Sequence, residues 1–324
     1  MPKTSLPPSY SIKAVKWLWV TLWQQMMSRI APRDKLGAYI RPESEFRHFL
    51  SNEPENPYKP ACGRYRLYVG LGCPWAHRTL VVRALKGLEE VIGVSIVVPA
   101  GDRGIWTLQQ PEENCTTLPD LYRLAQPNYQ GRCTVPVLWD SETKTIVNNE
   151  SGDIIQILNA YFNPWATNSE LNLYPESLQT DIDQLSEKIY HSVNNGVYRC
   201  GFAQTQGAYN QAVTELFNTL TELEDLLTQQ PYLCGETITL VDVRLFTTLF
   251  RFDLVYHGLF KCNYRRIVDY PNLSAYLTRI YSLPSVAATC NAEQIKQDYY
   301  GNLFPLNPGG IIPIGPELPG SYND

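Results

Sequence analysis

The sequence is poor in the residues that build metal clusters and disulfide scaffolds. It has only four histidines, and no two of its eight cysteines are separated by two residues, the spacing of a zinc ribbon. Eight cysteines in 324 residues are also too sparse for a disulfide-stabilised secreted domain. We therefore expect no metal, and we expect free thiols in a reducing, cytoplasmic compartment.

The sequence also lacks a long block of one charge and a long apolar run. With a net charge of −5 it offers no basic footprint for phosphates, so no nucleic-acid partner is expected. The apolar run at residues 14–23 is interrupted by Lys16 and falls short of the about 20 apolar residues that span a bilayer. It also has no small-residue cleavage site of a secretory signal.

Acidic residues are absent from positions 1–33, which carry the basic residues Lys3, Lys13, Lys16, Arg29 and Arg33. Within this arm, one helical face collects the apolar residues Val15, Leu18, Leu22 and Met26. One interpretation is a basic, tryptophan-bearing helix that rests on a membrane surface. A second is an arm packed on its own protein or on a second subunit. A third is a targeting segment that is removed, and the sequence leaves all three open.

The length of 324 residues suggests two domains or one large domain. Residues 65–69 alternate as a strand and lead through a glycine turn into a helix that begins at Cys73-Pro74. Further strands are predicted at 91–98, 134–139 and 145–147, with a loop over 99–133 and a helix from Ser151. This order predicts a small α/β unit.

Beyond Pro175 the periodicity is almost wholly helical. Thr239 to Asp242 form a capping box that opens an apolar helix. The stretch 305–319 contains five prolines and three glycines, so we expect an extended tail there. The second half of the chain is therefore predicted to be an all-helical domain.

Cys73 is the strongest candidate nucleophile. A cysteine that precedes a helix is exposed to free amides and to the helix dipole, which favour the thiolate and would lower the thiol pKa. His77 and Arg78 follow in the same turn and could add positive charge. Because position 76 is alanine, a mixed disulfide on Cys73 must wait for an external thiol such as glutathione. A buried structural cysteine remains the alternative.

Two further segments favour a glutathione pocket. A cis bond at Val135-Pro136 would turn the backbone groups of Val135 outward, where they could pair with an extended peptide. At Glu150-Ser151 the serine could cap a helix while the carboxylate meets a ligand ammonium group.

The full set of motifs resembles the glutathione transferase superfamily, and more narrowly the glutathionyl-hydroquinone reductases, or xi-class glutathione transferases. The segments that carry the resemblance are Cys73 to Arg78, Thr134 to Asp140, Asn149 to Ser151, Asn194 to Tyr198, Arg251 to Tyr256, Ile295 to Tyr300 and Asn307 to Pro316. The resemblance runs from about residue 38 to the end. It implies a thioredoxin-like α/β domain followed by an all-α domain, the glutathione transferase fold.

The resemblance also implies roles. Cys73 would attack the sulfur of a glutathionyl-hydroquinone, and a second glutathione would then release glutathione disulfide. Tyr198 would donate a proton to the departing aromatic carbon, while Tyr256 and Tyr299 would help to stabilise the thiolate. Glutathione, as cosubstrate, would be held by Trp106, Arg132, Cys133, Thr134, Val135, Glu150 and Ser151. The family implies a homodimer that pairs mainly through its helical domain.

Two positions depart from the family pattern. Asp298 replaces the usual histidine before Tyr299-Tyr300, where an acid could raise the thiol pKa or point to solvent. The tail segment 303–306 lacks the usual polar, histidine-containing sequence. Both departures bear on substrate range and rate.

We expect a basic arm at 1–37, a glutathione-binding domain at 38–163 and a helical substrate and dimerisation domain at 164–324. Two alternatives to hydroquinone reduction stay open. An omega-type enzyme, a dehydroascorbate reductase or protein deglutathionylase, would share Cys73 but would not need the three tyrosines together. A non-catalytic module of the same fold would dock through the N-terminal arm.

Overall fold

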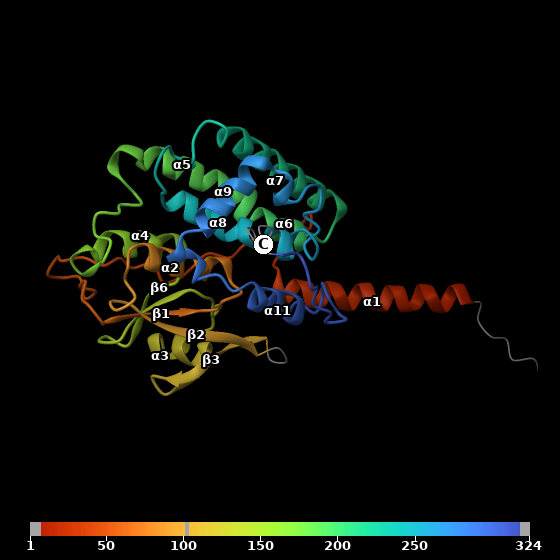
Figure 1. Cartoon of the computed structure of the whole chain (residues 1–324). Helices are drawn as coiled ribbons and strands as arrows, with labels where there is room; N and C mark the ends of the chain where they lie inside the picture. Colours follow the sequence, from red (N-terminus) through yellow and green to blue (C-terminus); the bar gives the residue numbers. More distant parts are fainter. Residues whose placement is uncertain (1–7, 101–103, 318–324) are drawn as a thin grey trace, which may run out of the picture.

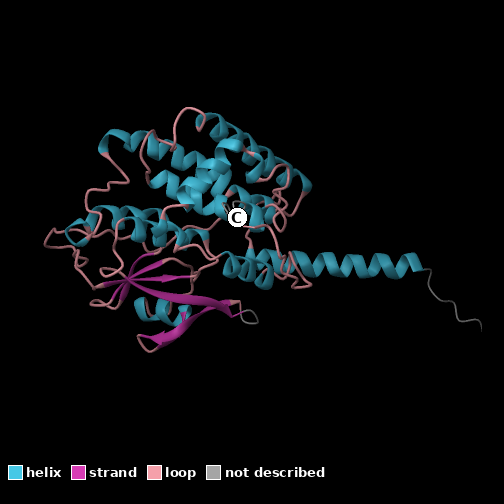
Figure 2. Ribbon diagram, viewed as in Figure 1, coloured by secondary structure: helices cyan, strands magenta, loops and turns pink. Residues whose placement is uncertain are grey.

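The computed structural model describes residues 8–100 and 104–317. A six-stranded sheet from the first half of the chain lies beside a group of helices from the second half (Figure 1). Figure 2 shows the strands confined to one side of the molecule, with the helical region beyond them. The predicted arrangement of an α/β unit followed by a helical unit is confirmed.

The sheet has the strand order β4-β3-β2-β1-β5-β6. β1 and β2 run parallel, and the other neighbours run antiparallel. β1 lies between β2 and β5, and its residues Leu67, Tyr68 and Val69 are fully buried, as expected for a strand covered on both faces. The strands are β1 (Tyr65–Val69), β2 (Gly93–Ala100), β3 (Ile105–Glu112), β4 (Cys115–Thr117), β5 (Val137–Asp140) and β6 (Thr145–Asn148).

The prediction of a loop over residues 99–133 is wrong. This stretch holds the end of β2, then β3 and β4, and the helix α3 (Leu118–Ala125). β3 buries only Leu108 among its eight residues, so the hydrophobic alternation that marks a half-buried strand is missing. α3 begins at a capping box between Thr117 and Asp120, a local signal that was overlooked.

The helix α2 (Pro74–Leu85) follows β1 directly, with Cys73 at its N-cap. Pro74 suits the first helical position because its missing N–H would have no partner there. The helix ends before Gly87, whose φ of +64° is easily adopted without a side chain. α2 and α4 (Ser151–Tyr161) lie on the side of the sheet that faces the helical region, and α3 lies on the other side (Figure 1).

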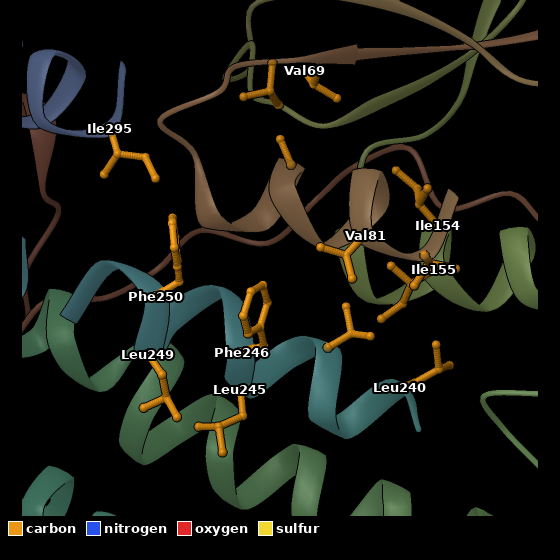
Figure 3. Packing of buried hydrophobic residues seen from close by; sticks show 14 of the residues in the cluster. Val69, Val81, Ile154, Ile155, Leu240, Leu245, Phe246, Leu249, Phe250 and Ile295 are labelled. Atoms are coloured by element: carbon orange, nitrogen blue, oxygen red, sulfur yellow. The ribbon is translucent and has the colours of Figure 1, made fainter. Parts of the chain in front are cut away.

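The helical region is organised around α8 (Leu240–Arg251), in which every residue except Arg244 is buried. Its start at the Thr239–Asp242 capping box is confirmed. Figure 3 shows α8 side chains meeting Val81 of α2 and the isoleucines of α4, so one core joins both halves of the chain. The other helices are α5 (Gln179–Ile189), α6 (Gly196–Gly201), α7 (Gln206–Leu226), α9 (Pro271–Tyr281), α10 (Pro284–Ala287) and α11 (Ala292–Asn302).

Two π-helical segments interrupt the regular helices. One covers Tyr190–Asn194 after α5, and the other covers Phe252–Tyr256 after α8. Such segments are rare and often lie at functional sites. Short 3-10 turns occupy Asn163–Trp165, Glu176–Leu178 and Ile267–Asp269.

The N-terminal arm forms the helix α1 (Pro8–Ile30), which extends away from the body of the molecule (Figure 1). No helix within the described ranges is long and apolar enough to cross a membrane. At the other end, residues 303–317 contain turns but no helix, which confirms the extended tail as far as it is described. The last part of the predicted tail, residues 318 and 319, lies outside the described residues.

Candidate active site

Cys73 lies between β1 and α2, at the end of the tight glycine turn that connects them. Its Sγ is 3.7 Å from the carbonyl oxygen of Val135, so the thiol faces the loop that precedes β5. The N–H groups of Trp75 and Ala76, in the first turn of α2, are directed at the sulfur. The predicted placement of Cys73 at the start of a helix is therefore confirmed.

The expected lowering of the Cys73 pKa is not found. Burial raises the pKa of this thiol, and the opposing influences only reduce the shift. Those influences are the N–H of Ala76, the charges of Arg251 and Arg41, and the N–H of Trp75. Desolvation of a thiolate is costly, and here it outweighs the helix N-terminus in the ligand-free protein.

His77 does not supply the positive charge that its position suggested. Arg251 Nη1 donates to His77 Nδ1 at 2.9 Å, so the proton of the ring is on Nε2, which lies 2.9 Å from Thr289 Oγ1. Burial and the charge of Arg251 hold the pKa of His77 well below its usual value. The ring is therefore neutral at physiological pH.

Arg78 also has other partners than the Cys73 thiol. Its Nη2 donates to Asn194 Oδ1 at 2.6 Å, and its Nη1 donates to Ser151 Oγ at 3.3 Å. Burial lowers the pKa of Arg78 to about 9, and the charge of Arg244 adds to this effect. Arg78 therefore ties α2 to α4 and to the π-helical segment that contains Asn194.

The loop before β5 presents backbone groups beside Cys73. The Val135-Pro136 peptide bond is cis, as the sequence suggested. The Val135 N–H makes no hydrogen bond with any described residue. The preceding residue Thr134 is held by Tyr122, whose hydroxyl donates to the Thr134 carbonyl at 2.8 Å. Tyr122 thus fixes the loop at Thr134, next to a buried Val135 whose N–H has no partner among the described residues.

Arg132 and Cys133 lie on the same loop. The side chain of Arg132 is exposed, and its carbonyl accepts a hydrogen bond from Tyr129 at 3.3 Å. Cys133 is half-buried against the core, and burial raises the pKa of its thiol. These two residues therefore differ in access although they are adjacent.

At the start of α4 the capping roles differ from the prediction. Glu150, not Ser151, caps the helix, because its carboxylate accepts the N–H of Gly152 at 3.1 Å. Its other oxygen accepts a hydrogen bond from Ser44 at 3.0 Å. Ser151 is buried and accepts the bond from Arg78 described above.

Trp106 comes from β3, which lies within the stretch that was predicted to be a loop. A side chain at Gly70 would meet the Trp106 ring at 2.7 Å, so the ring lies directly against the turn that leads to Cys73. Trp106 is half-buried and packs on the core. The structure thus brings Trp106, Val135 and Cys73 into one neighbourhood.

The three predicted tyrosines form a cluster. Tyr299 of α11 connects the other two, with its hydroxyl oxygen 2.6 Å from that of Tyr198 and 3.0 Å from that of Tyr256. Tyr198 comes from α6 and Tyr256 from the π-helical segment after α8. A negative charge on Cys73 raises the pKa of both Tyr198 and Tyr256, so both hydroxyl groups lie near the thiol.

Burial keeps all three phenols protonated. It raises the pKa of Tyr256 to about 12 and the pKa of Tyr198 and Tyr299 well above the ordinary value of tyrosine. Neutral phenols can donate hydrogen bonds or protons to a nearby anion. The cluster can therefore act as a source of protons beside Cys73.

Arg251 is a residue of this region whose role the sequence analysis missed. Fully buried on α8, it donates from Nε to the Gly72 carbonyl at 2.9 Å and from Nη2 to the Leu71 carbonyl at 3.0 Å. The same guanidinium donates to the Thr247 carbonyl at 3.0 Å. It therefore holds the turn before Cys73 against α8. Its place in the motif Arg251 to Tyr256 was the available signal.

Asp298 does not point to solvent, and it is not among the main influences on the pKa of Cys73. Its Oδ2 accepts the N–H of Gly72 at 3.0 Å, and its Oδ1 accepts a bond from Gln294 at 2.8 Å. A side chain at Gly72 would collide with this carboxylate, at 2.4 Å from Oδ2. Asp298 therefore supports the turn from the α11 side.

Arg41 was also missed. Its guanidinium stacks on the ring of Trp75, 3.9 Å from the ring centroid, and Arg78 lies 4.4 Å from the same centroid. Arg41 makes no hydrogen bond or ion pair with the part of the chain that the structure describes. Its charge lowers the pKa of Cys73, so this free cation lies close to the thiol.

The described residues contain no group of three or more histidine, cysteine or acidic side chains placed to hold a metal ion. All eight cysteines lie in the described part and are free thiols.

Comparisons with known proteins identify relatives of this chain. The glutathione S-transferase N-terminal domain model matches residues 72–160, and the C-terminal domain model matches residues 206–279. Glutathionyl-hydroquinone reductase PcpF of Sphingobium chlorophenolicum is 45% identical over 291 residues, 87% of this chain and 91% of that protein.

Two solved structures are similar over nearly the whole chain. The xi glutathione transferase of Phanerochaete chrysosporium has a TM-score of 0.84 and 45% identity, covering 88% of this chain and 94% of that one. The glutathione-bound structure of YqjG from Escherichia coli, a glutathionyl-hydroquinone reductase, has a TM-score of 0.78 and 44% identity, covering 85% and 96%. This chain therefore belongs to the glutathione transferase superfamily and, within it, to the xi class, the family of the glutathionyl-hydroquinone reductases.

Proposed function

We propose that this protein is an enzyme that reduces glutathionyl-hydroquinones to hydroquinones with glutathione as cosubstrate. The observation that carries the proposal is the position of Cys73, whose Sγ lies 3.7 Å from the Val135 carbonyl oxygen and close enough to Tyr198 and Tyr256 for their charges to interact. Reductases of this family are the relatives with which the chain shares 45% identity.

The reaction has two steps. In the first, the Cys73 thiolate attacks the sulfur of the glutathionyl-hydroquinone, and the bond between sulfur and the ring carbon breaks. The electron pair of that bond stays on the ring carbon, which takes a proton from Tyr198. In the second, the thiolate of another glutathione attacks the glutathione sulfur of the mixed disulfide, which frees Cys73 and releases glutathione disulfide.

We assign glutathione binding to the predicted set Trp106, Arg132, Cys133, Thr134, Val135, Glu150 and Ser151. The Val135 N–H without a partner among the described residues supports this role, because it can donate a hydrogen bond to a carbonyl of an extended peptide. The carboxylate of Glu150 suits the ammonium group of glutathione, and the indole of Trp106 lies against the turn that leads to Cys73.

The tyrosine cluster gives the proton its route. Tyr198 is protonated and hydrogen-bonded to Tyr299, which is in turn bonded to Tyr256. After Tyr198 gives its proton to the ring carbon, donation from Tyr299 stabilises the phenolate until solvent restores the proton. We assign Tyr256 and Tyr299 the role of hydrogen-bond donors to the Cys73 thiolate once it has formed.

We further propose that the protein works as a homodimer in the cytoplasm, paired mainly through its helical domain. Its eight free thiols support a reducing compartment. The position of the strands supports the proposed division at 1–37, 38–163 and 164–324, because those in the described part of the chain lie between Tyr65 and Asn148.

The test is a single turnover. The pure protein is mixed with a glutathionyl-hydroquinone in the absence of free glutathione, and the intact mass is measured alongside the products. We expect Cys73 to gain one glutathione while an equal amount of hydroquinone appears. If no hydroquinone is released although Cys73 still accepts glutathione from glutathione disulfide, the hydroquinone role is wrong and the omega-type function takes its place.

A Tyr198→Phe variant separates the two functions further. We expect hydroquinone release to fall by about 10²- to 10⁴-fold, the usual contribution of a general acid, while transfer from glutathione disulfide continues. Tyr264→Phe is the matched control, because the Tyr264 side chain is 82% exposed. Equal hydroquinone release by both variants would remove Tyr198 from the mechanism.

A further inference from the structure

The helix α1 is the part of the molecule that the proposed function leaves unused. It projects from the body of the protein (Figure 1). Every residue from Ser9 to Leu22 is exposed. The contacts that anchor the helix lie in its last two turns, where Met27 is buried and Trp23 donates its indole N–H to the Pro305 carbonyl at 3.0 Å. These 14 exposed residues span about 21 Å of helix.

The free part of α1 is rich in large apolar side chains. The exposed ones are Ile12, Val15, Trp17, Leu18, Trp19, Val20 and Leu22. Contiguous apolar surface of this kind is uncommon on soluble single chains and marks contact with a partner or a membrane. The surface needs an occupant.

Four of these seven apolar side chains share one face of the helix. At 100° per residue, Ile12, Val15, Trp19 and Leu22 point within about 80° of one another. A shallow depression on this face is lined by Ile12, Val15 and Trp19 together with Ser11 and Lys16. Lys16 thus borders the apolar face. Its alkyl chain can lie along this face while its ammonium group points away from the apolar side chains.

Charge decides between possible occupants. The chain as a whole carries −5, yet residues 1–33 contain no acid and five basic residues, so the rest of the chain is more acidic than the total. A bilayer with anionic headgroups would attract the arm and repel the body, which orients the molecule on the surface. Two α1 helices paired side by side would bring lysines together with no acid on either helix to compensate them.

We propose that α1 binds the surface of an anionic lipid bilayer and lies in the interface, with Ile12, Val15, Trp19 and Leu22 inserted among the headgroups. The helix is not apolar enough to span the bilayer. Tryptophan favours the interface because its ring is apolar and its N–H is polar. The body of the enzyme then stays attached to the surface through the last two turns of α1. This binding does not depend on the catalytic activity.

The test uses the full-length protein and sedimentation with vesicles. We expect the protein to pellet with phosphatidylcholine vesicles that contain phosphatidylglycerol, to pellet much less with pure phosphatidylcholine, and to be released by high salt. The triple variant Ile12→Ser, Val15→Ser, Trp19→Ser should lower the partition coefficient by about tenfold or more. Trp17→Ser, on the opposite side of the helix, is the matched control and should bind as the unchanged protein does.

Formation of the Cys73–glutathione disulfide by both variants reports an intact fold, because α1 contributes no residue to the active site. The proposal is overturned if the protein stays in the supernatant with anionic vesicles or if the triple variant and Trp17→Ser pellet alike. A change from dimer to monomer in light scattering on the triple variant, without vesicle binding by the unchanged protein, would assign the face to a second copy.

Discussion

The thiol of Cys73 is subject to opposing influences that single residues exert. Burial raises its pKa, while the N–H of Ala76 and the cations Arg251 and Arg41 lower it. Of these two cations, Arg41 is the one that donates no hydrogen bond to the described part of the chain. A bound glutathione brings carboxylates into this region, so the balance at Cys73 depends on what occupies the site.

His77 makes the stability of the protein depend on pH. Its folded-state pKa lies well below 6.5, because burial and the charge of Arg251 oppose protonation. Below about pH 6.5 the unfolded chain therefore binds a proton that the folded protein does not, and the free energy of unfolding falls as the pH falls. The loss reaches up to about 1.4 kcal/mol per pH unit for this one group.

We predict that His77→Gln removes this component. Urea unfolding at about pH 7 and about pH 5.5 should show a smaller acid-induced loss of stability in the variant, by about 1 kcal/mol, than in the unchanged protein. His191→Gln, at an exposed position, serves as the control and should keep the full loss. The assignment is wrong if His77→Gln and His191→Gln respond to pH alike.

At the scale of elements, strands and helices with a buried face were predictable. The alternation at residues 65–69 and the apolar rhythm after Cys73 correspond to β1 and α2. β3 was missed because most of its side chains are partly or fully exposed, which erases the pattern. The π-helical segment that carries Tyr256 also has no signature in a 3.6-residue period.

The site followed the same rule. Motif positions identified Cys73, Val135 and the three tyrosines, because their side chains or backbone groups belong to short, recognisable segments. Arg41 and the contacts of Arg251 could not be found in this way, because each acts on Cys73 across tertiary contacts that join distant segments. The direction of the Cys73 pKa was mistaken because the sequence shows the helix start but not the depth of burial.

We expect the cap at the start of α8 to stabilise the protein more than any other helix cap. Asp242 is fully buried, and its carboxylate accepts hydrogen bonds from the N–H of Leu233 at 2.9 Å, the N–H of Thr239 at 2.7 Å and the hydroxyl of Tyr276 at 3.0 Å. Removal of the carboxylate leaves these buried donors without partners. α8 is the centre of the helical core, so the loss is not confined to one turn.

We predict that Asp242→Ala lowers the free energy of unfolding by about 3–5 kcal/mol, as measured by urea denaturation. Glu222→Ala breaks an exposed ion pair with Lys188 and should cost less than about 1 kcal/mol. Similar denaturation midpoints for the two variants would show that the Asp242 cap does not stabilise α8.

At the scale of the whole molecule, Arg251 connects the helical region to the catalytic turn. One guanidinium on α8 reaches the carbonyls of Leu71 and Gly72 and the ring of His77, all of which belong to the first half of the chain. Its charge also lowers the pKa of Cys73. The Arg251 side chain therefore both packs the two halves together and influences the reactivity of the Cys73 thiol.

We predict that the two roles of Arg251 separate in two variants. Arg251→Met removes both the hydrogen bonds and the charge, so it should destabilise the protein and raise the pKa of Cys73, and each unit of rise slows alkylation below the pKa about tenfold. Arg251→Lys keeps the charge but cannot reach all the acceptors, so it should lose stability while the thiol pKa stays close to its original value. The pH dependence of Cys73 alkylation, resolved by peptide mass, measures the thiol pKa.

Arg279→Met, which removes an exposed arginine bonded to the Pro231 carbonyl, is the control for both measurements. If Arg251→Met leaves the alkylation profile unchanged, the charge does not act on Cys73 and Arg251 is only a structural tie between the halves. If Arg251→Lys raises the thiol pKa as much as Arg251→Met does, the position of the turn and not the charge controls the thiol. The expected split between the variants therefore distinguishes electrostatic tuning from simple packing of the two halves.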